Sequence, residues 1–135
     1  MREKIDAALV GGRRWREILI VGSECSAGNA KSLNSYHLKA HDDDGLKWHF
    51  VVGNGSLSRN GEIEVGPRWD RQVPAGSGSV DSLEIALIGE LSDGWPTQKQ
   101  ADAVAELVDY LQAKVGVVPV RVAASTGSTL LRRPR

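Results

Sequence analysis

The sequence predicts a single α/β domain in which a central mixed β-sheet is flanked by helices. Three observations lead to this prediction: apolar strand-like segments at 18–21 and 83–88, a hairpin pattern across 48–65, and a helix pattern that starts at Pro96. Strands and helices alternate along only part of the chain, which is typical of a mixed sheet with helices packed on it. The 135 residues suffice for one domain with a sizeable core but not for two independently stable domains.

The composition excludes several function classes. The 17 basic and 17 acidic side chains balance, so no overall field attracts nucleic acid or anionic lipid. The single cysteine, Cys25, excludes an internal disulfide framework. The apolar segment 5–10 contains Asp6 and is too short for a signal peptide or a membrane span. As written, the sequence predicts a soluble cytoplasmic protein with no nucleic-acid or membrane partner; it leaves open whether a leader is missing.

The first elements along the chain are a short helix and an apolar strand. Ile5, Ala8 and Leu9 share one side of the predicted helix, so residues 1–14 are predicted to be an N-terminal extension that clamps onto the domain. Four consecutive apolar residues, Ile18–Val21, indicate a strand that is covered on both faces. We therefore expect this strand to lie centrally in the sheet.

A second helix and a hairpin follow. Residues 31–41 carry an apolar side at helical spacing and predict the helix. The strand-like segments 48–52 and 62–65 are joined by a connection containing Asn60-Gly61, which indicates two paired strands. Residues 72–81 are rich in small, turn-forming residues and predict a surface loop of the kind that borders sites.

The last elements are a strand, a long capped helix and a short strand. Residues 83–88 alternate as a strand with two different faces, so Glu84 and Ala86 are expected to point the same way. Thr97 and Gln100 have the spacing of a capping box and predict a helix start there. Residues 120–123 are predicted to be the last strand.

Six segments of the chain carry a family resemblance through their order and spacing. They are Trp15–Val21, Tyr36-His37, Trp48–Gly53, Glu62–Trp69, Leu83–Gly89 and Pro96–Gln100. Together they resemble successive landmarks of the zinc-dependent N-acetylmuramoyl-L-alanine amidases and the peptidoglycan recognition proteins. The resemblance implies the family's mixed sheet in an amidase-like domain over residues 15–125. Residues 126–135 lack an apolar period apart from Leu130-Leu131 and predict an irregular C-terminal tail.

The same resemblance exposes a missing metal site. In the family, two histidines and one cysteine or acidic residue hold a zinc ion, which activates water against the amide joining N-acetylmuramic acid to L-alanine. The first and second histidine positions correspond here to Val21 and, approximately, Ser125. From Tyr110 to Arg135 there is no histidine, cysteine, aspartate or glutamate to serve as the third ligand. We therefore predict no catalytic residues, no metal and no cofactor, zinc being the cofactor of active relatives.

The first functional hypothesis is a catalytically degenerate amidase-like protein that binds peptidoglycan fragments or a protein partner without hydrolysing them. The candidate residues of its binding cleft are Trp48, Asn54, Arg68, Ser77, Glu84 and Ser125. Trp48 is assigned to the cleft, whereas Trp69 is assigned to the core. Glu84 has two interpretations: it fills the vacated metal position against Arg68 or Arg121, or, as the favoured interpretation, it is an ordinary carboxylate at an edge.

Two alternatives remain. The first is an active amidase whose metal is relocated to Cys25, His37 or His41, since the two histidines lie four apart on one helix face. The second is a structural or interaction protein whose cleft is filled by side chains. The favoured roles involve no metal. His37 is packed, His41 is solvated at a helix end, and His49 is a hydrogen-bonded structural residue. No neighbouring base that could activate the Cys25 thiol is identifiable in the sequence.

Overall fold

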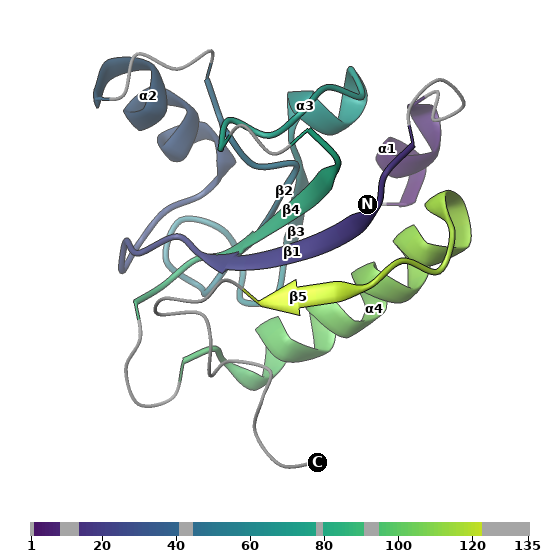
Figure 1. The fold of residues 1–135 in the computed structure, drawn as a ribbon. Helices are drawn as coiled ribbons and strands as arrows, with labels where there is room; N and C mark the ends of the chain where they lie inside the picture. Colours follow the sequence, from purple (N-terminus) through teal and green to yellow (C-terminus); the bar gives the residue numbers. More distant parts are fainter. Residues whose placement is uncertain (1, 9–13, 41–44, 78–79, 91–94, 123–135) are drawn as a thin grey trace.

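The computed structural model describes residues 2–8, 14–40, 45–77, 80–90 and 95–122 (Figure 1). A five-stranded mixed sheet lies between helices on its two sides, which confirms the predicted fold class. The strands are β1 (Glu17–Gly22), β2 (Phe50–Val52), β3 (Ile63–Val65), β4 (Ser82–Leu87) and β5 (Val120–Val122). The helices are α1 (Arg2–Ala7), α2 (Ala30–Ala40), α3 (Pro67–Asp70) and α4 (Gln98–Val115).

The strand order is β3-β2-β4-β1-β5, so β4 is the middle strand. It pairs in parallel with β1 and β2, and β5 pairs in parallel with β1. Among the strands of the described residues, only the β2–β3 pair is antiparallel, with Phe50 opposite Val65. This confirms the predicted hairpin, whose connection turns at Gly61 with φ of +84°, a backbone conformation that glycine adopts without strain.

The strand covered on both faces is β4 and not β1, which corrects one prediction. All six residues of β4 are buried. In β1, Ile18 and Ile20 are fully buried, whereas Leu19 and Val21 are only half-buried. The reason is the coverage by helices: α4 packs under β1 and β4, whereas the core on the α2 side is built mainly over β2 and β4.

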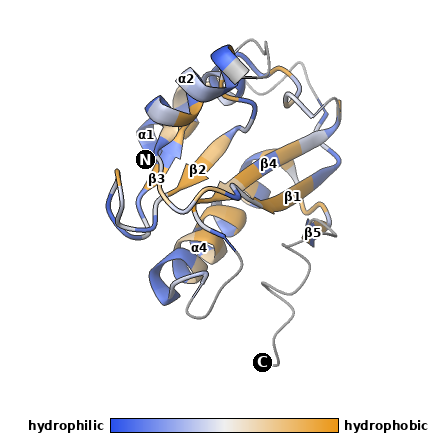
Figure 2. Cartoon of the chain, turned by 90° about the vertical axis from the view of Figure 1, so that its left-hand side faces the viewer, coloured by the Kyte–Doolittle hydropathy of each residue, from blue (hydrophilic) through white to orange (hydrophobic). Residues whose placement is uncertain are grey.

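Two apolar clusters lie on opposite faces of the sheet. The larger cluster joins α4 to the sheet through Val104, Leu107 and Leu111. The smaller cluster joins α2 to β2 and β4, through Leu33 packed with Val51 and Ala86. Figure 2 shows β1, β2 and β4 coloured mainly as hydrophobic, in agreement with their position between these clusters.

The start of α4 confirms the predicted capping box. The Thr97 hydroxyl accepts a hydrogen bond from the Gln100 amide at 3.0 Å, and the Gln100 side-chain oxygen accepts one from the Thr97 amide at 3.0 Å. The buried Gln100 amide group also donates to the backbone oxygens of Val52, at 3.2 Å, and Ile88, at 2.9 Å. The helix start is thereby fixed to the ends of two neighbouring strands.

The N-terminal helix packs on the domain, as its pattern predicted. Ile5 is fully buried in the larger cluster, and its carbonyl accepts a hydrogen bond from the indole of Trp69 at 3.1 Å. Trp69 is fully buried, which confirms its assignment to the core. Leu9, Ala123 and the predicted tail lie outside the described residues. None of the helices within the described residues is long and apolar enough to cross a membrane.

Replacing Thr97 by alanine is expected to lower the free energy of unfolding by about 1 kcal/mol, because the amide of Gln100 loses its capping acceptor. Urea unfolding followed by circular dichroism measures this change. Thr97→Ser keeps the hydroxyl and is the matched control, expected to stay closer to the parent protein. Equal stability of the alanine variant and the parent would contradict the capping role.

Candidate functional site

The candidate site is the face of β1 and β4 that points away from α4. Parallel pairing sets the two strands in register, and alternate residues of each strand share a face. We call this surface the β1–β4 face. Its members are Glu17, Leu19 and Val21 on β1 and Ser82, Glu84 and Ala86 on β4. The face is polar at the end where both strands begin and apolar toward the end where they finish.

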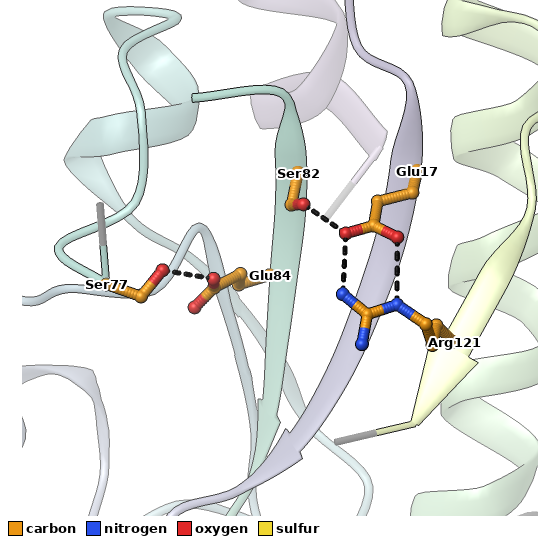
Figure 3. A network of polar contacts seen from close by, with 5 residues as sticks. All are labelled: Glu17, Ser77, Ser82, Glu84 and Arg121. Atoms are coloured by element: carbon orange, nitrogen blue, oxygen red, sulfur yellow. Dashed lines mark hydrogen bonds and ion pairs between the residues drawn. The ribbon is translucent and has the colours of Figure 1, made fainter. Parts of the chain in front are cut away.

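A polar network occupies the beginning of this face (Figure 3). The Arg121 guanidinium on β5 donates to both carboxylate oxygens of Glu17, each at 3.0 Å, and the Ser82 hydroxyl donates to the same carboxylate. These bonds, with Arg121 first and Ser82 second, lower the pKa of Glu17. Because the Arg121 side chain is 59 % exposed, the pair orients the two groups more than it stabilises the fold.

Glu84 is the buried acidic group of the site. Its residue is 2 % exposed, and its carboxylate accepts a hydrogen bond from the Ser77 hydroxyl at 2.6 Å (Figure 3). Burial raises the pKa of Glu84, while the Ser77 hydrogen bond and the nearby charges of Lys47 and Arg68 oppose the rise. A protonated carboxyl is therefore favoured more here than in water.

These contacts correct both interpretations of Glu84. It does not lie at a sheet edge, because β4 is the middle strand. Arg121 bonds to Glu17 instead, and Arg68 donates to the backbone oxygens of Leu46 at 2.8 Å and Pro74 at 2.9 Å. Arg68 therefore acts on Glu84 only through its charge.

His49 supports Glu84 from the neighbouring chain segment. Its Nδ1 accepts a hydrogen bond from the Glu84 amide at 3.0 Å, and its Nε2 lies 2.9 Å from the carbonyl oxygen of Val73. Since a carbonyl can only accept, Nε2 carries the hydrogen and the ring is neutral. His49 is fully buried, which confirms the predicted hydrogen-bonded structural role.

The other predicted cleft residues are less close to this centre. Trp48 is 6 % exposed and its ring packs edge-on against His37 at 5.0 Å, so it offers little surface for stacking on a sugar, contrary to its assignment to the cleft. Asn54 lies beyond the end of β2, where its side chain donates to the Ser26 carbonyl at 3.0 Å. Ser125 lies outside the described residues.

Sequence reasoning missed part of the site. Glu17 and Ser82 were not singled out, and Leu19 was read as part of a strand buried on both faces. The alternation of Glu17, Leu19 and Val21 was a usable signal, but the run of four apolar residues concealed it. The pairing of Glu17 with Arg121, 104 residues away, had no local signal.

Val21, at the position that the family resemblance assigns to the first zinc ligand, carries an apolar side chain. Val21 is half-buried near the end of β1, faces Ala86 in the register, and packs against the smaller apolar cluster. Neither side chain has an atom that can bind a metal ion. At the proposed relocated site, the Nδ1 of His37 accepts a hydrogen bond from the Lys47 amide at 3.2 Å, and Cys25 is half-buried. His41 lies outside the described residues, and among those described no group of three His, Cys, Asp or Glu side chains could hold a metal.

The chain is similar to one protein family and to several solved structures. The sequence profile of the N-acetylmuramoyl-L-alanine amidases matches residues 12–128. No curated protein sequence matches the chain. Among the solved structures that share its fold are three with sequence identities of 15–19 %, too low to show more than the fold.

The first of these structures is bumblebee PGRP-SA, with 19 % identity over 81 % of this chain and 70 % of that chain and a TM-score of 0.65. The N-acetylmuramoyl-L-alanine amidase LysC from Clostridium intestinale URNW has the same identity, coverage and TM-score. Human PGRP-IBETAC in complex with glycosamyl muramyl pentapeptide has 15 % identity over 90 % of this chain and 76 % of that chain, with a TM-score of 0.67.

Replacing Glu84 by glutamine is expected to change how stability depends on pH. Because the native pKa is raised, the folded state holds its proton more tightly than the unfolded state. The parent protein should therefore lose stability relative to Glu84→Gln as pH rises from the ordinary glutamate pKa through the raised value. Free energies of unfolding of both proteins across pH 4–8 measure the difference.

Ser77→Ala is the companion variant for this measurement. It removes the hydrogen bond that favours the carboxylate, so its loss of stability with rising pH should be steeper than that of the parent. A parent protein that instead gains stability over Glu84→Gln with rising pH would show that Lys47 and Arg68 outweigh the burial.

Proposed function

The chain belongs to the N-acetylmuramoyl-L-alanine amidase family, and from that premise we propose that it binds peptidoglycan fragments without hydrolysing them. The observation that carries this proposal is the chemistry of the metal positions. Val21 stands near the end of β1, and no histidine, cysteine, aspartate or glutamate occurs between Tyr110 and Arg135. The proposed binding surface is the β1 part of the β1–β4 face, where Glu17, Leu19 and Val21 are half-buried, because the β4 members of the face are buried.

Hydrolysis by the family mechanism requires a zinc ion with three protein ligands and one open position for water or substrate. The valine and alanine side chains at this end of the β1–β4 face supply no ligand, and serine hydroxyls near residue 125 are poor substitutes. The residues present therefore do not fit zinc at the family position.

Binding has weaker requirements than hydrolysis, since a concave surface with apolar and hydrogen-bonding walls is enough. The half-buried Leu19 and Val21 offer apolar area to the face of a sugar ring or to an alanine methyl group. Glu17 and Arg121 offer an acceptor and donors for hydroxyl and amide groups beside them. The human relative was solved with glycosamyl muramyl pentapeptide, which supports a ligand of this class.

Titration of the labelled protein with N-acetylmuramoyl-L-alanyl-D-glutamate is expected to shift the backbone amide NMR signals of Leu19, Val21 and Arg121. The outward-facing Asp102 and Ala113 of α4 are the internal control and should not shift, because they lie on the other side of the sheet. Absence of any shift at millimolar ligand would contradict binding and favour the interaction protein with a filled cleft.

The protein is expected to release no peptide from N-acetylmuramoyl-L-alanine substrates, with or without added Zn²⁺, because the ligand set is missing at several positions. Chromatographic detection of the freed amino terminus measures the reaction. The Clostridium intestinale amidase LysC, assayed in parallel, is the positive control. Zinc-dependent release that is lost on chelation would establish the relocated metal site and refute the proposal.

A further inference from the structure

An open apolar groove of about 290 Å³ lies between α4 and the edge strand β5. Its lining combines two buried residues, Ile20 and Val104, with the more accessible Ala105, Val108 and Val120. Figure 1 shows β5 at the edge of the sheet, beside α4. Because the β1–β4 face points away from α4, this groove is separate from the proposed binding surface.

Strand β5 leaves one side of the groove uncovered. It is the last strand in the sheet order and pairs with β1, and in the part of the chain that the structure describes its outer edge pairs with no strand. Val120 is 41 % exposed, although its register partner Ile18 is fully buried. An open strand edge beside exposed apolar side chains favours pairing with, or burial under, another segment.

The lining of the groove indicates what can fill it. Ligand pockets typically have about 300–1,000 Å³ and several polar groups, so this groove suits aliphatic side chains better than a whole small molecule. Among the described residues, Asp109 is the one charged residue of the lining, and it forms no ion pair there. The occupant is therefore expected to carry aliphatic side chains next to a positive charge.

Residues 123–135 of the same chain have this composition. Leu130 and Leu131 are the only large aliphatic residues of that segment, and Arg132 and Arg133 follow them directly. The segment contains no acidic residue that would repel Asp109. Its sequence therefore matches both the apolar lining and the charge of the groove.

The connection is long enough to reach the groove. Val120 already lines it, β5 ends at Val122, and Leu130 follows eight residues later, a distance of up to about 26 Å for an extended chain. The groove extends along α4 from Ala101 to Asp109, which is about 12 Å of helix. A short tether gives an effective concentration on the order of millimolar, so the segment outcompetes a second copy of the protein at micromolar concentration.

We propose that Leu130 and Leu131 dock into the groove between α4 and β5 of the same molecule, with the arginines that follow them beside Asp109. This contact covers the open side of β5. It goes beyond the proposed function and does not depend on it, because the groove lies on the opposite side of the sheet from the β1–β4 face.

Nuclear Overhauser cross-peaks between methyl groups test this contact directly. In protein labelled on leucine and valine methyls, cross-peaks are expected from Leu130 and Leu131 to Val108 and Val120. They should be absent from a mixture in which half of the molecules carry only the leucine label and the other half only the valine label. Absence of the cross-peaks from the doubly labelled protein would overturn the proposal. Cross-peaks in the mixture would also overturn it, because they would show that the groove binds a second copy.

Two sets of variants test the same contact by differential scanning calorimetry. Leu130→Ser/Leu131→Ser is expected to lower Tm by about 5 °C, because two leucine side chains lose apolar contacts. Ala105→Arg brings bulk and a repelling charge into the groove and is expected to lower Tm and remove the cross-peaks. Ala113→Arg, at an exposed position of the same helix outside the groove, is the matched control and should keep both.

These variants can fold whether or not the contact exists, because Ala105 and Ala113 are both exposed and the two leucines lie beyond the last strand. An unchanged Tm in Leu130→Ser/Leu131→Ser would overturn the proposal. Equal effects of arginine at positions 105 and 113 would overturn it as well.

Discussion

Strand β4 is buried on both of its faces and hydrogen-bonded to a parallel strand along each edge, and the rest of the fold is arranged around it. Leu83, Ile85 and Leu87 pack toward α4, whereas Ala86 and Ile88 pack toward α2. The same burial encloses the carboxyl group of Glu84, which would be costly if it were left without partners. Ser77 bonds to the carboxyl group and His49 accepts from the backbone amide, so a surface loop and a buried histidine are both tied to this strand.

The fold that is built around β4 is that of the amidase family, whereas the side chains on it differ from those of a zinc site. Under the proposed function, Val21, which the register sets beside Ala86, stands where the family resemblance implies a zinc ligand, while the family membership and the sheet are retained. Folds persist when the reactions they once supported are lost. This side of the sheet carries a half-buried apolar strip and a carboxylate–guanidinium pair, groups suited to recognition.

The helices, strands and turns could be predicted because they depend on local sequence patterns. The site could be predicted only in part, because it depends on contacts between residues far apart in the chain. The Thr97–Gln100 capping box and the turn at Gly61 depend on neighbours in the chain and were predictable. Which strand occupies the middle of the sheet depends on pairing between distant segments, so the half-buried face of β1 and the burial of Glu84 were not foreseen. Ser77 and Glu84 were each named as candidates, but their direct hydrogen bond follows only from the packing of the loop on β4.

The central claim is that this chain has no set of side chains able to hold the zinc ion of its family. Measurement of bound metal most directly tests it: the purified protein is incubated with excess Zn²⁺, exchanged into metal-free buffer, and analysed by inductively coupled plasma mass spectrometry. The account predicts far less than one zinc ion per protein molecule. One tightly held zinc ion per molecule would contradict it.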